Sequence, residues 1–312
     1  MILVCGEALV DAVNNPDGSQ RLMPGGGPFN TARALARFRV PTAFLGHLST
    51  DASGCMLAEL LAAEGANLDL VTYGSEPTTV ALAEVDQDGL AKYEFFVEGT
   101  SAPNLTPLMI PDELAPDINA VHVGTLGLVL EPMASTLMHM IRRESAQRLV
   151  MLDPNIRPGL AADNQKYRDC LSRLVAQSTI VKASEADLSW LNPELGYEAA
   201  AERILEAGAR LVVVTLGSQG AFAITDNMRL SAQAPRVDVV DTIGAGDAFS
   251  AGLLAWLHEH DRIHVELNLE ADELRAALEF GCLAASLTCA KAGAEPPTRV
   301  EVEGARTSRA TD

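Results

Sequence analysis

The sequence predicts an α/β fold with a small β-flap beside its main sheet. Short apolar runs with the composition of strands alternate with longer segments of helical periodicity, which is typical of β-α-β units. One run, residues 149–152, is apolar without interruption, as expected of a parallel strand that is buried on both faces. A hairpin signal at residues 86–89 interrupts the alternation and predicts the flap.

The other elements follow from the same patterns, taken in chain order. Apolar runs predict strands over residues 2–5, 42–47, 79–85, 91–97, 120–123, 179–182, 211–214 and 221–224, and an extended run over 237–240. Apolar residues at helical spacing predict helices over residues 31–38, 52–64, 133–143, 188–190, 248–257 and 274–288. Turn-forming residues fill positions 14–19, and residues 303–312 are predicted to be a frayed tail.

Two neighbouring aromatic residues, Phe95 and Phe96, lie in the second strand of the flap. They could cover a substrate, or they could form the flap's own small core. We expect at least one of them to have the second role.

The composition excludes several classes of protein. The chain has 312 residues, of which 48% are hydrophobic, so it can bury the core of one large α/β domain. A net charge of -19 argues against a surface that binds nucleic acid or an anionic membrane. The five cysteines lack the spacing of a zinc site, so we expect reduced, buried thiols. Without a signal-peptide pattern or an apolar run of membrane-spanning length, a cytoplasmic protein is expected.

The most informative stretch is Asp-Thr-Ile-Gly-Ala-Gly-Asp at residues 241–247. Gly244 and Gly246 would let the backbone come close to a ligand, and the helix that follows would direct unpaired N–H groups at an anion. Asp247, at the mouth of that site, could deprotonate a hydroxyl that attacks a phosphoryl group. It could equally be a helix cap, because Asp is a preferred N-cap residue. The motif alone leaves both interpretations open.

Three other polar residues stand beside strand ends or glycine turns. Asn30 follows three glycines at residues 25–27, and its amide can both donate to and accept from a pair of sugar hydroxyls. Asp11 lies a few residues past a strand end and could accept from substrate hydroxyls, although a solvated loop carboxylate is the more common case. Arg157 could bind phosphate oxygens or sugar hydroxyls, or form a surface ion pair.

Several other kinds of site are not indicated. The glycines before Asn30 match neither a dinucleotide fingerprint nor a Walker A loop. His258, His260 and His264 lie close together in the sequence, but Arg262 stands where a zinc-binding helix would need its second histidine. We therefore interpret these histidines as part of a polar helix end.

These motifs together resemble those of the ribokinase-like (PfkB) carbohydrate kinases. Residues 25–30 resemble the first signature of that family, residues 241–247 the second, residues 215–220 its nucleotide-binding turn, and residues 6–11 its opening motif. Residues 153–157 (Asp-Pro-Asn-Ile-Arg), 182–187 and 93–100 are similar to elements of its bacterial fructokinases. Because the motifs occur in the family's order along nearly the whole chain, the combination is more specific than any one of them.

The resemblance implies a fold and an activity. The fold would be a single domain over residues 1–312, a three-layer α/β/α sandwich with a Rossmann-like sheet and a β-sheet lid formed by about 11–24 and 76–98. The enzyme would transfer the γ-phosphate of ATP to the primary hydroxyl of a free sugar, with fructose giving fructose 6-phosphate. It would use Mg²⁺ and, as many relatives do, a monovalent cation such as K⁺. The resemblance leaves a homodimer open.

The same resemblance assigns roles residue by residue. Asp247 would be the base, and the cradle for the developing charge would be Gly244, Ala245 and Gly246. The sugar would be bound by Asp11, Gly26, Gly27, Asn30 and Arg157. The nucleotide would be bound by Lys182, Thr215, Gly217 and Gly220. Magnesium would be oriented through water by Asp187, and the monovalent cation would be held by Asp241 and the carbonyls of Ile243 and Gly293.

One difficulty and three alternatives accompany this prediction. A helix N-terminus stabilises Asp247 as an anion, which would make it a weak base. A loose transition state reduces the problem, because the incoming hydroxyl then loses its proton late. The alternatives are a kinase of 2-keto-3-deoxygluconate, ribose or a nucleoside, a non-catalytic sugar-binding protein, and a nicotinamide dehydrogenase. The intact Asp247 argues against the second, and the missing glycine fingerprint against the third.

Overall fold

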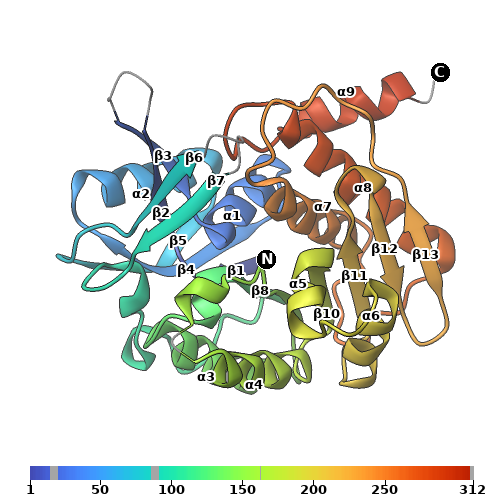
Figure 1. Ribbon diagram of the computed structural model, residues 1–312, viewed down its shortest axis with the longest axis horizontal. Coiled ribbons are helices and arrows are strands. Elements are labelled where there is room, and N and C mark those ends of the chain that lie inside the picture. Colours follow the sequence, from blue (N-terminus) through green and yellow to red (C-terminus); the bar gives the residue numbers. More distant parts are fainter. Residues whose placement is uncertain (15–19, 86–90, 162, 310–312) are drawn as a thin grey trace.

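A nine-stranded sheet forms the middle layer of the protein, in a computed structural model that describes residues 1–14, 20–85, 91–161 and 163–309 (Figure 1). In spatial order its strands are β13 (Arg229–Ala232), β12 (Ala221–Ile224), β11 (Leu211–Thr215), β10 (Ile180–Ser184), β9 (Leu149–Asp153), β8 (Ala120–Gly124), β1 (Ile2–Cys5), β4 (Thr42–Ser49) and β5 (Asn67–Gly74). The strands from β11 to β5 run parallel, and β12 and β13 add an antiparallel edge. Parallel strands bring their carboxyl ends to one edge of the sheet, where α/β proteins bind ligands.

Helices cover both faces of this sheet, because its strands are apolar on both sides. On one face lie α1 (Gly27–Arg37), α2 (Ala52–Glu64), α7 (Ala245–Glu259), α8 (Ala271–Cys289) and α9 (Arg299–Arg309). On the other face lie α3 (Met133–Glu144), α4 (Asn164–Val175), α5 (Glu185–Leu191) and α6 (Tyr197–Glu206). Along β1, Ile2 and Val4 pack into the first core, and Leu3 and Cys5 into the second. The predicted three-layer α/β/α sandwich is confirmed.

A second sheet of four strands stands beside the first. Its order is β3 (Gln20–Gly25), β2 (Leu9–Asn14), β6 (Val80–Val85) and β7 (Ala91–Phe96), with β2 and β6 parallel. It is joined to β1 by residues 6–8, and β3 leads into α1. The sheet therefore stands over the carboxyl end of β1. Short 3₁₀ turns cover Ala102–Asn104, Pro107–Met109, Thr125–Leu128, Pro158–Leu160 and Gly217–Gln219.

Some elements differ from the sequence predictions. Strands β2, β3, β5 and β13 and helices α4 and α6 were not predicted from the local pattern. Residues 237–240 are not a strand, since the amide of Val240 donates to the Cys289 carbonyl at the end of α8 instead of to a sheet. Residues 303–309 are not frayed but belong to α9, because Val302 is fully buried and docks that helix on the core. Residues 15–19 of the turn cluster and the connection at 86–89 lie outside the described residues.

Two shifted helix starts bear on the site. Helix α1 begins at Gly27, four residues earlier than expected, because Pro28 fits a first helical turn. Helix α7 begins at Ala245, so it includes Asp247. No helix in the described ranges combines the length and apolarity that a membrane crossing would need.

Candidate active site

A cavity of about 1150 Å³ opens at the carboxyl ends of the central strands. It is bounded by the loops after β8 to β11, the first turns of α1 and α7, and one side of α8. Most of the predicted site residues line it: Asp11, Gly26, Gly27, Asn30, Arg157, Lys182, Asp187, Thr215, Gly217, Gly220, Ile243, Gly244, Ala245, Gly246 and Asp247. Asp241 and Gly293 do not. The fold thus gathers into one cavity residues that are more than two hundred positions apart in the sequence.

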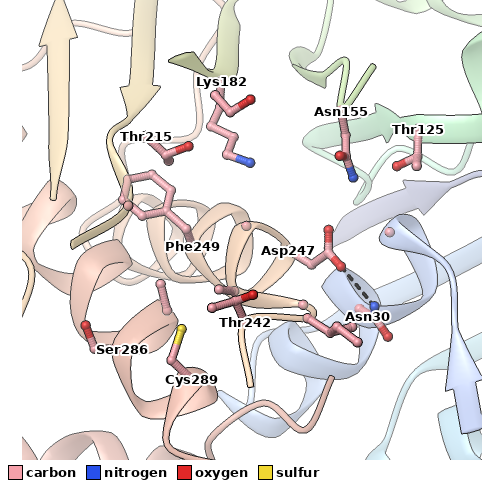
Figure 2. Close-up of a pocket in the computed structure, with 18 of the residues that line it drawn as sticks. Asn30, Thr125, Asn155, Lys182, Thr215, Thr242, Asp247, Phe249, Ser286 and Cys289 are labelled. Carbon is pink, nitrogen blue, oxygen red and sulfur yellow. Dashed lines mark hydrogen bonds between the residues drawn. The ribbon is translucent and has the colours of Figure 1, made fainter. Parts of the chain in front are cut away.

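Two helix N-termini meet at the centre of the cavity. The Asn30 amide nitrogen of α1 donates to the Asp247 carboxylate of α7 at 2.9 Å, as the dashed line in Figure 2 shows. The N-cap of α7 is Gly244, in the left-handed conformation with φ 77°, and no side chain of the described residues caps this helix. The helix-cap interpretation of Asp247 is therefore wrong. The amide oxygen of Asn30 is buried without a protein partner in the described part of the chain.

The environment of Asp247 also resolves the difficulty about its basicity. Burial raises its pKa to about 7, although the hydrogen bond from Asn30 and the charges of Lys182 and Arg157 act against the rise. The charge of Asp153 adds to the increase. The expectation of a weak base considered only the helix terminus and omitted desolvation, which is the larger effect here. A carboxylate with a pKa near neutrality is suited to accept a proton.

The anion cradle in front of Asp247 is partly free. The amide of Ala245 donates to the Thr242 carbonyl at 3.3 Å, so it is already engaged. Within the described ranges, the amides of Gly244 and Gly246 have no acceptor in the protein. Two of the three predicted donors are therefore available to an anion.

The glycines of the first turn are held tightly by neighbouring atoms. A Cβ on Gly27 would lie 2.3 Å from the Thr125 hydroxyl and 3.3 Å from the Asp247 carboxylate. Gly26 has φ 106°, and its Cβ would lie 2.8 Å from the Glu7 carbonyl. The buried Glu7 carboxyl group accepts from the amides of Gly27 and Gly127, each at 3.2 Å, and burial raises its pKa to about 8. Sequence reasoning gave Glu7 no role, although it lies in the opening motif.

Asp11 and Arg157 lie near each other at one end of the cavity. Asp11 belongs to strand β2 and is only 9% exposed, so the solvated-loop interpretation is wrong. Burial raises its pKa to about 6, and the charge of Arg157 partly offsets this rise. The Arg157 guanidinium donates to the carbonyls of Asn155 and Ile156 and, in the described part of the chain, forms no ion pair. Its charge thus remains available inside the cavity.

Lys182 is buried in an ion pair. Its ammonium donates to the Asp153 carboxylate at 2.8 Å, with side chains only 5% and 4% exposed. The same Asp153 oxygen accepts from the Ser250 hydroxyl of α7 at 3.0 Å. Burial favours the neutral amine, but the charges of Asp153, Asp247 and Asp187 outweigh it and raise the pKa of Lys182. Burial lowers the pKa of the neighbouring His122 to about 3, so that histidine is neutral.

In the predicted nucleotide turn one glycine is crowded by neighbouring atoms and the other is not, and the nearby Asp187 is fully hydrogen-bonded. Gly220 has φ 98° and its Cβ would lie 2.0 Å from the Ala232 carbonyl, whereas a Cβ on Gly217 would meet open space. Asp187 closes a capping box with Ser184 and also accepts from the Ile156 amide at 2.7 Å. Both oxygens of Asp187 therefore have protein partners.

Asp241 ties two loops together behind the anion cradle. Its carboxylate accepts from the amides of Ile243 at 3.0 Å and Gly293 at 2.9 Å. The Gly293 carbonyl accepts from the Glu295 amide at 2.8 Å. In the described residues no cluster of three or more His, Cys, Asp and Glu side chains could hold a metal.

Sequence reasoning missed several residues that line the cavity. Thr125 and Asn155, labelled in Figure 2, follow β8 and β9 and have positive φ angles of 54° and 38°. Their position after parallel strands is a signal that could have found them. Ser286 and Cys289 come from the last turn of α8, where no local pattern distinguishes a cavity-lining residue from a core residue.

Comparison with known proteins agrees with this geometry. The model of the pfkB family of carbohydrate kinases matches residues 1–300. A fructokinase of Rhizobium leguminosarum bv. trifolii is 40% identical over 261 residues, covering 82% of this chain and 79% of the relative. The structure of a Xylella fastidiosa fructokinase with bound ATP superimposes with a TM-score of 0.92 at 23% identity, covering 99% of this chain and 98% of the other. A Vibrio cholerae O395 fructokinase double mutant, bound to fructose, ADP and potassium, gives 0.87 at 25% identity and covers 97% of each chain.

The fold and the cavity therefore define a sugar kinase that uses ATP. The chain belongs to the pfkB family of carbohydrate kinases. The prediction of an enzyme of this class is confirmed, and the non-catalytic and dehydrogenase alternatives are set aside.

Proposed function

We propose that this enzyme phosphorylates the 6-hydroxyl of fructose, with Asp247 as the base. The observation that carries the proposal is the contact between Asp247 and Asn30, in which the second glycine motif meets the first. One residue of the pair would accept the proton of the attacking hydroxyl. The other would hold a neighbouring hydroxyl through its amide oxygen, which has no partner in the described part of the protein.

The reaction would proceed by in-line transfer. A bond would form between the sugar oxygen and the γ-phosphorus, and the bond from that phosphorus to the bridging oxygen of ADP would break. The hydroxyl proton would pass to Asp247, whose pKa near 7 suits a late transfer in a loose transition state. The amides of Gly244 and Gly246 would stabilise the charge that develops on the phosphoryl oxygens.

The remaining sites follow from the lining of the cavity. The nucleotide would lie on the β11 side of the cavity, away from Asp11 and Asn30. Its neighbours there would be Thr215, Gly217 and Gly220. Magnesium would be carried by the phosphates. Asp187 would contact it only through water, because both of its carboxylate oxygens already accept hydrogen bonds from the protein. Asp241 would support a potassium site with the carbonyls of Ile243 and Gly293. The potassium bound in the related Vibrio cholerae structure supports the use of this ion.

The choice of fructose rests on the relatives and on the polar end of the cavity. The sugar hydroxyls would meet Asp11, Asn30 and Arg157, and the four-stranded sheet that carries Asp11 would serve as the lid. A site that pairs hydroxyls rejects analogues that lack them, because its own polar groups would be left unsatisfied.

A sugar panel tests the assignment. ADP release from ATP is measured with fructose, 2-keto-3-deoxygluconate, ribose and adenosine, at saturating Mg²⁺ with and without K⁺. We expect the highest kcat/KM with fructose and the loss of activity with a deoxy analogue. A higher value for any other member of the panel would reject the fructose assignment and leave only the kinase class.

A further inference from the structure

We propose that Lys182 touches the transferring phosphoryl group and is a catalytic residue, held in place by Asp153. The inference builds on the proposed function, because it places the γ-phosphate between the nucleotide turn and Asp247. It assigns to Lys182 a role beyond general nucleotide binding, and it assigns to Asp153 a positioning role.

The first observation is the place of the ammonium group. Lys182 is the middle residue of β10, and its side chain lines the cavity. Figure 2 shows it on the same side as Thr215, with its nitrogen directed into the space that Asp247 faces. A Cβ placed on Gly246 would lie 3.0 Å from this nitrogen. The ammonium therefore lies against the anion cradle, on the side of the nucleotide turn.

The second observation is that the ammonium has spare hydrogen-bonding capacity. A lysine side chain has three N–H donors. In the described part of the chain, only Asp153 accepts from Lys182. Since the side chain is 5% exposed, water has little access to the other two donors. A buried donor without a partner is costly, which is the condition that a phosphoryl oxygen would relieve.

The third observation is that the Asp153 carboxylate links two parts of the site by hydrogen bonds. One of its oxygens accepts from Lys182 of β10 and from Ser250 of α7. Ser250 is one helical turn beyond Asp247, so Asp153 fixes the lysine relative to the helix that carries the base. Burial keeps the neighbouring His122 neutral, so in the described part of the chain Lys182 carries the positive charge beside Asp153.

The competing explanation is that Lys182 only neutralises a buried Asp153. Removing one member of a buried ion pair is destabilising, whereas replacing both members is often neutral or stabilising. A single variant of Lys182 therefore cannot separate the two explanations, but a double variant can.

The experiment compares K182M, D153N/K182M and the control K166M. Lys166 is a lysine of α4 with an 86% exposed side chain, outside the cavity. For each variant we would measure the melting temperature, kcat with the preferred sugar, and the equilibrium affinities for ATP and ADP without sugar. We expect K182M and the double variant to lose roughly 10²–10³-fold in kcat, as for the loss of one transition-state donor. Their affinity for ATP should fall at least about tenfold, with ADP affinity nearly unchanged.

The double variant decides the matter. If it regains the parent's kcat together with the parent's stability, Lys182 serves only to neutralise Asp153 and the proposal is wrong. Equal losses of ATP and ADP affinity would also overturn it, since they would place the lysine away from the γ-phosphate. Because the nucleotide affinities are measured without sugar, they remain decisive even if fructose proves not to be the substrate.

Discussion

The two glycine turns at the N-termini of α1 and α7 look alike in sequence but differ in what surrounds them. In the first turn, a Cβ on Gly26 or Gly27 would collide with protein atoms at 2.8 and 2.3 Å. In the second, the nearest atom to a Cβ on Gly246 is the Nζ of the Lys182 side chain, at 3.0 Å. The first turn therefore needs glycine for packing. In the second turn Gly244 does too, since its Cβ would lie 2.7 Å from the Ala294 Cβ, but Gly246 leaves space that a ligand can fill. Within one site, glycine before a helix is therefore needed for two different reasons: close packing of protein atoms, and room for a ligand.

The largest expected effect tests whether the second turn carries the chemistry. Asp247→Asn keeps the shape of the side chain and removes the base. We expect kcat to fall roughly 10²–10⁴-fold. Folding should be nearly unaffected, because a neutral side chain replaces a buried carboxylate whose charge burial disfavours. Near-full turnover in this variant would mean that Asp247 has no role in proton transfer.

The next effect contrasts the two turns directly. Gly246→Val should lower kcat at least about 10²-fold, because its side chain would occupy the space of the phosphoryl group. Stability should hold, since valine is no worse than glycine in a helix.

Its counterpart is Gly26→Ala, in the first turn. A residue with a side chain at φ 106° is strained, so we expect the free energy of unfolding to fall by about 1–3 kcal/mol. Both properties are read from thermal melts and steady-state kinetics of the two variants. If Gly246→Val lost stability and kept its kcat, the difference between the two turns would be disproved.

The contents of each turn were largely predictable from the sequence, but the contact between the turns was not. Gly244, Gly246 and Asp247 act within one turn of chain, so their spacing alone indicates an anion site beside a carboxylate. The bond that joins Asn30 to Asp247 spans 217 residues. It depends on how two helices pack across the sheet, which no local pattern specifies.

Burial explains the other differences between sequence and structure. A solvated loop carboxylate was one of two interpretations of Asp11, but pairing with β3 and β6 places it on a strand inside the cavity. The basicity of Asp247 was expected to be low from its helix position, but desolvation raises its pKa instead of lowering it. The C-terminal residues look polar enough to fray, yet the buried Val302 and the ion pair from Arg299 to Glu259 of α7 hold α9 in place.

A smaller effect tests the sugar side of the first turn. A Cβ on Gly25 would lie 2.2 Å from the Asp11 carboxylate, so this carboxylate lies directly over the turn. Asp11→Ala should weaken fructose use by about 1.5–3 kcal/mol, the range for hydrogen bonds to a charged group. The measurement is kcat/KM for fructose beside the KM for ATP. A rise in the ATP KM alone would place Asp11 in the nucleotide half of the site.

The smallest expected effect is a pH dependence that separates the two carboxylates. Asp247 must be ionised to accept a proton, and its pKa is raised to about 7 by burial. Below that pH the fraction of ionised base falls, so kcat/KM should drop, approaching tenfold per pH unit. Asp11, with a pKa raised to about 6, should add a second and lower step in the same direction, because a protonated carboxyl group accepts hydrogen bonds from the sugar less well.

Variants assign the two steps. The hydrogen bond from Asn30 lowers the pKa of Asp247, so Asn30→Ala should move the upper midpoint to higher pH, whatever it does to the maximal rate. Asp11→Ala should abolish the lower step and leave the upper one in place. The measurement is kcat/KM from about pH 5 to 9 for the parent and both variants, with stability checked across the range. If the upper midpoint stays fixed in Asn30→Ala, the titrating base is a group other than Asp247. The hydrogen bond between the two turns would then have no effect on the pKa of the base.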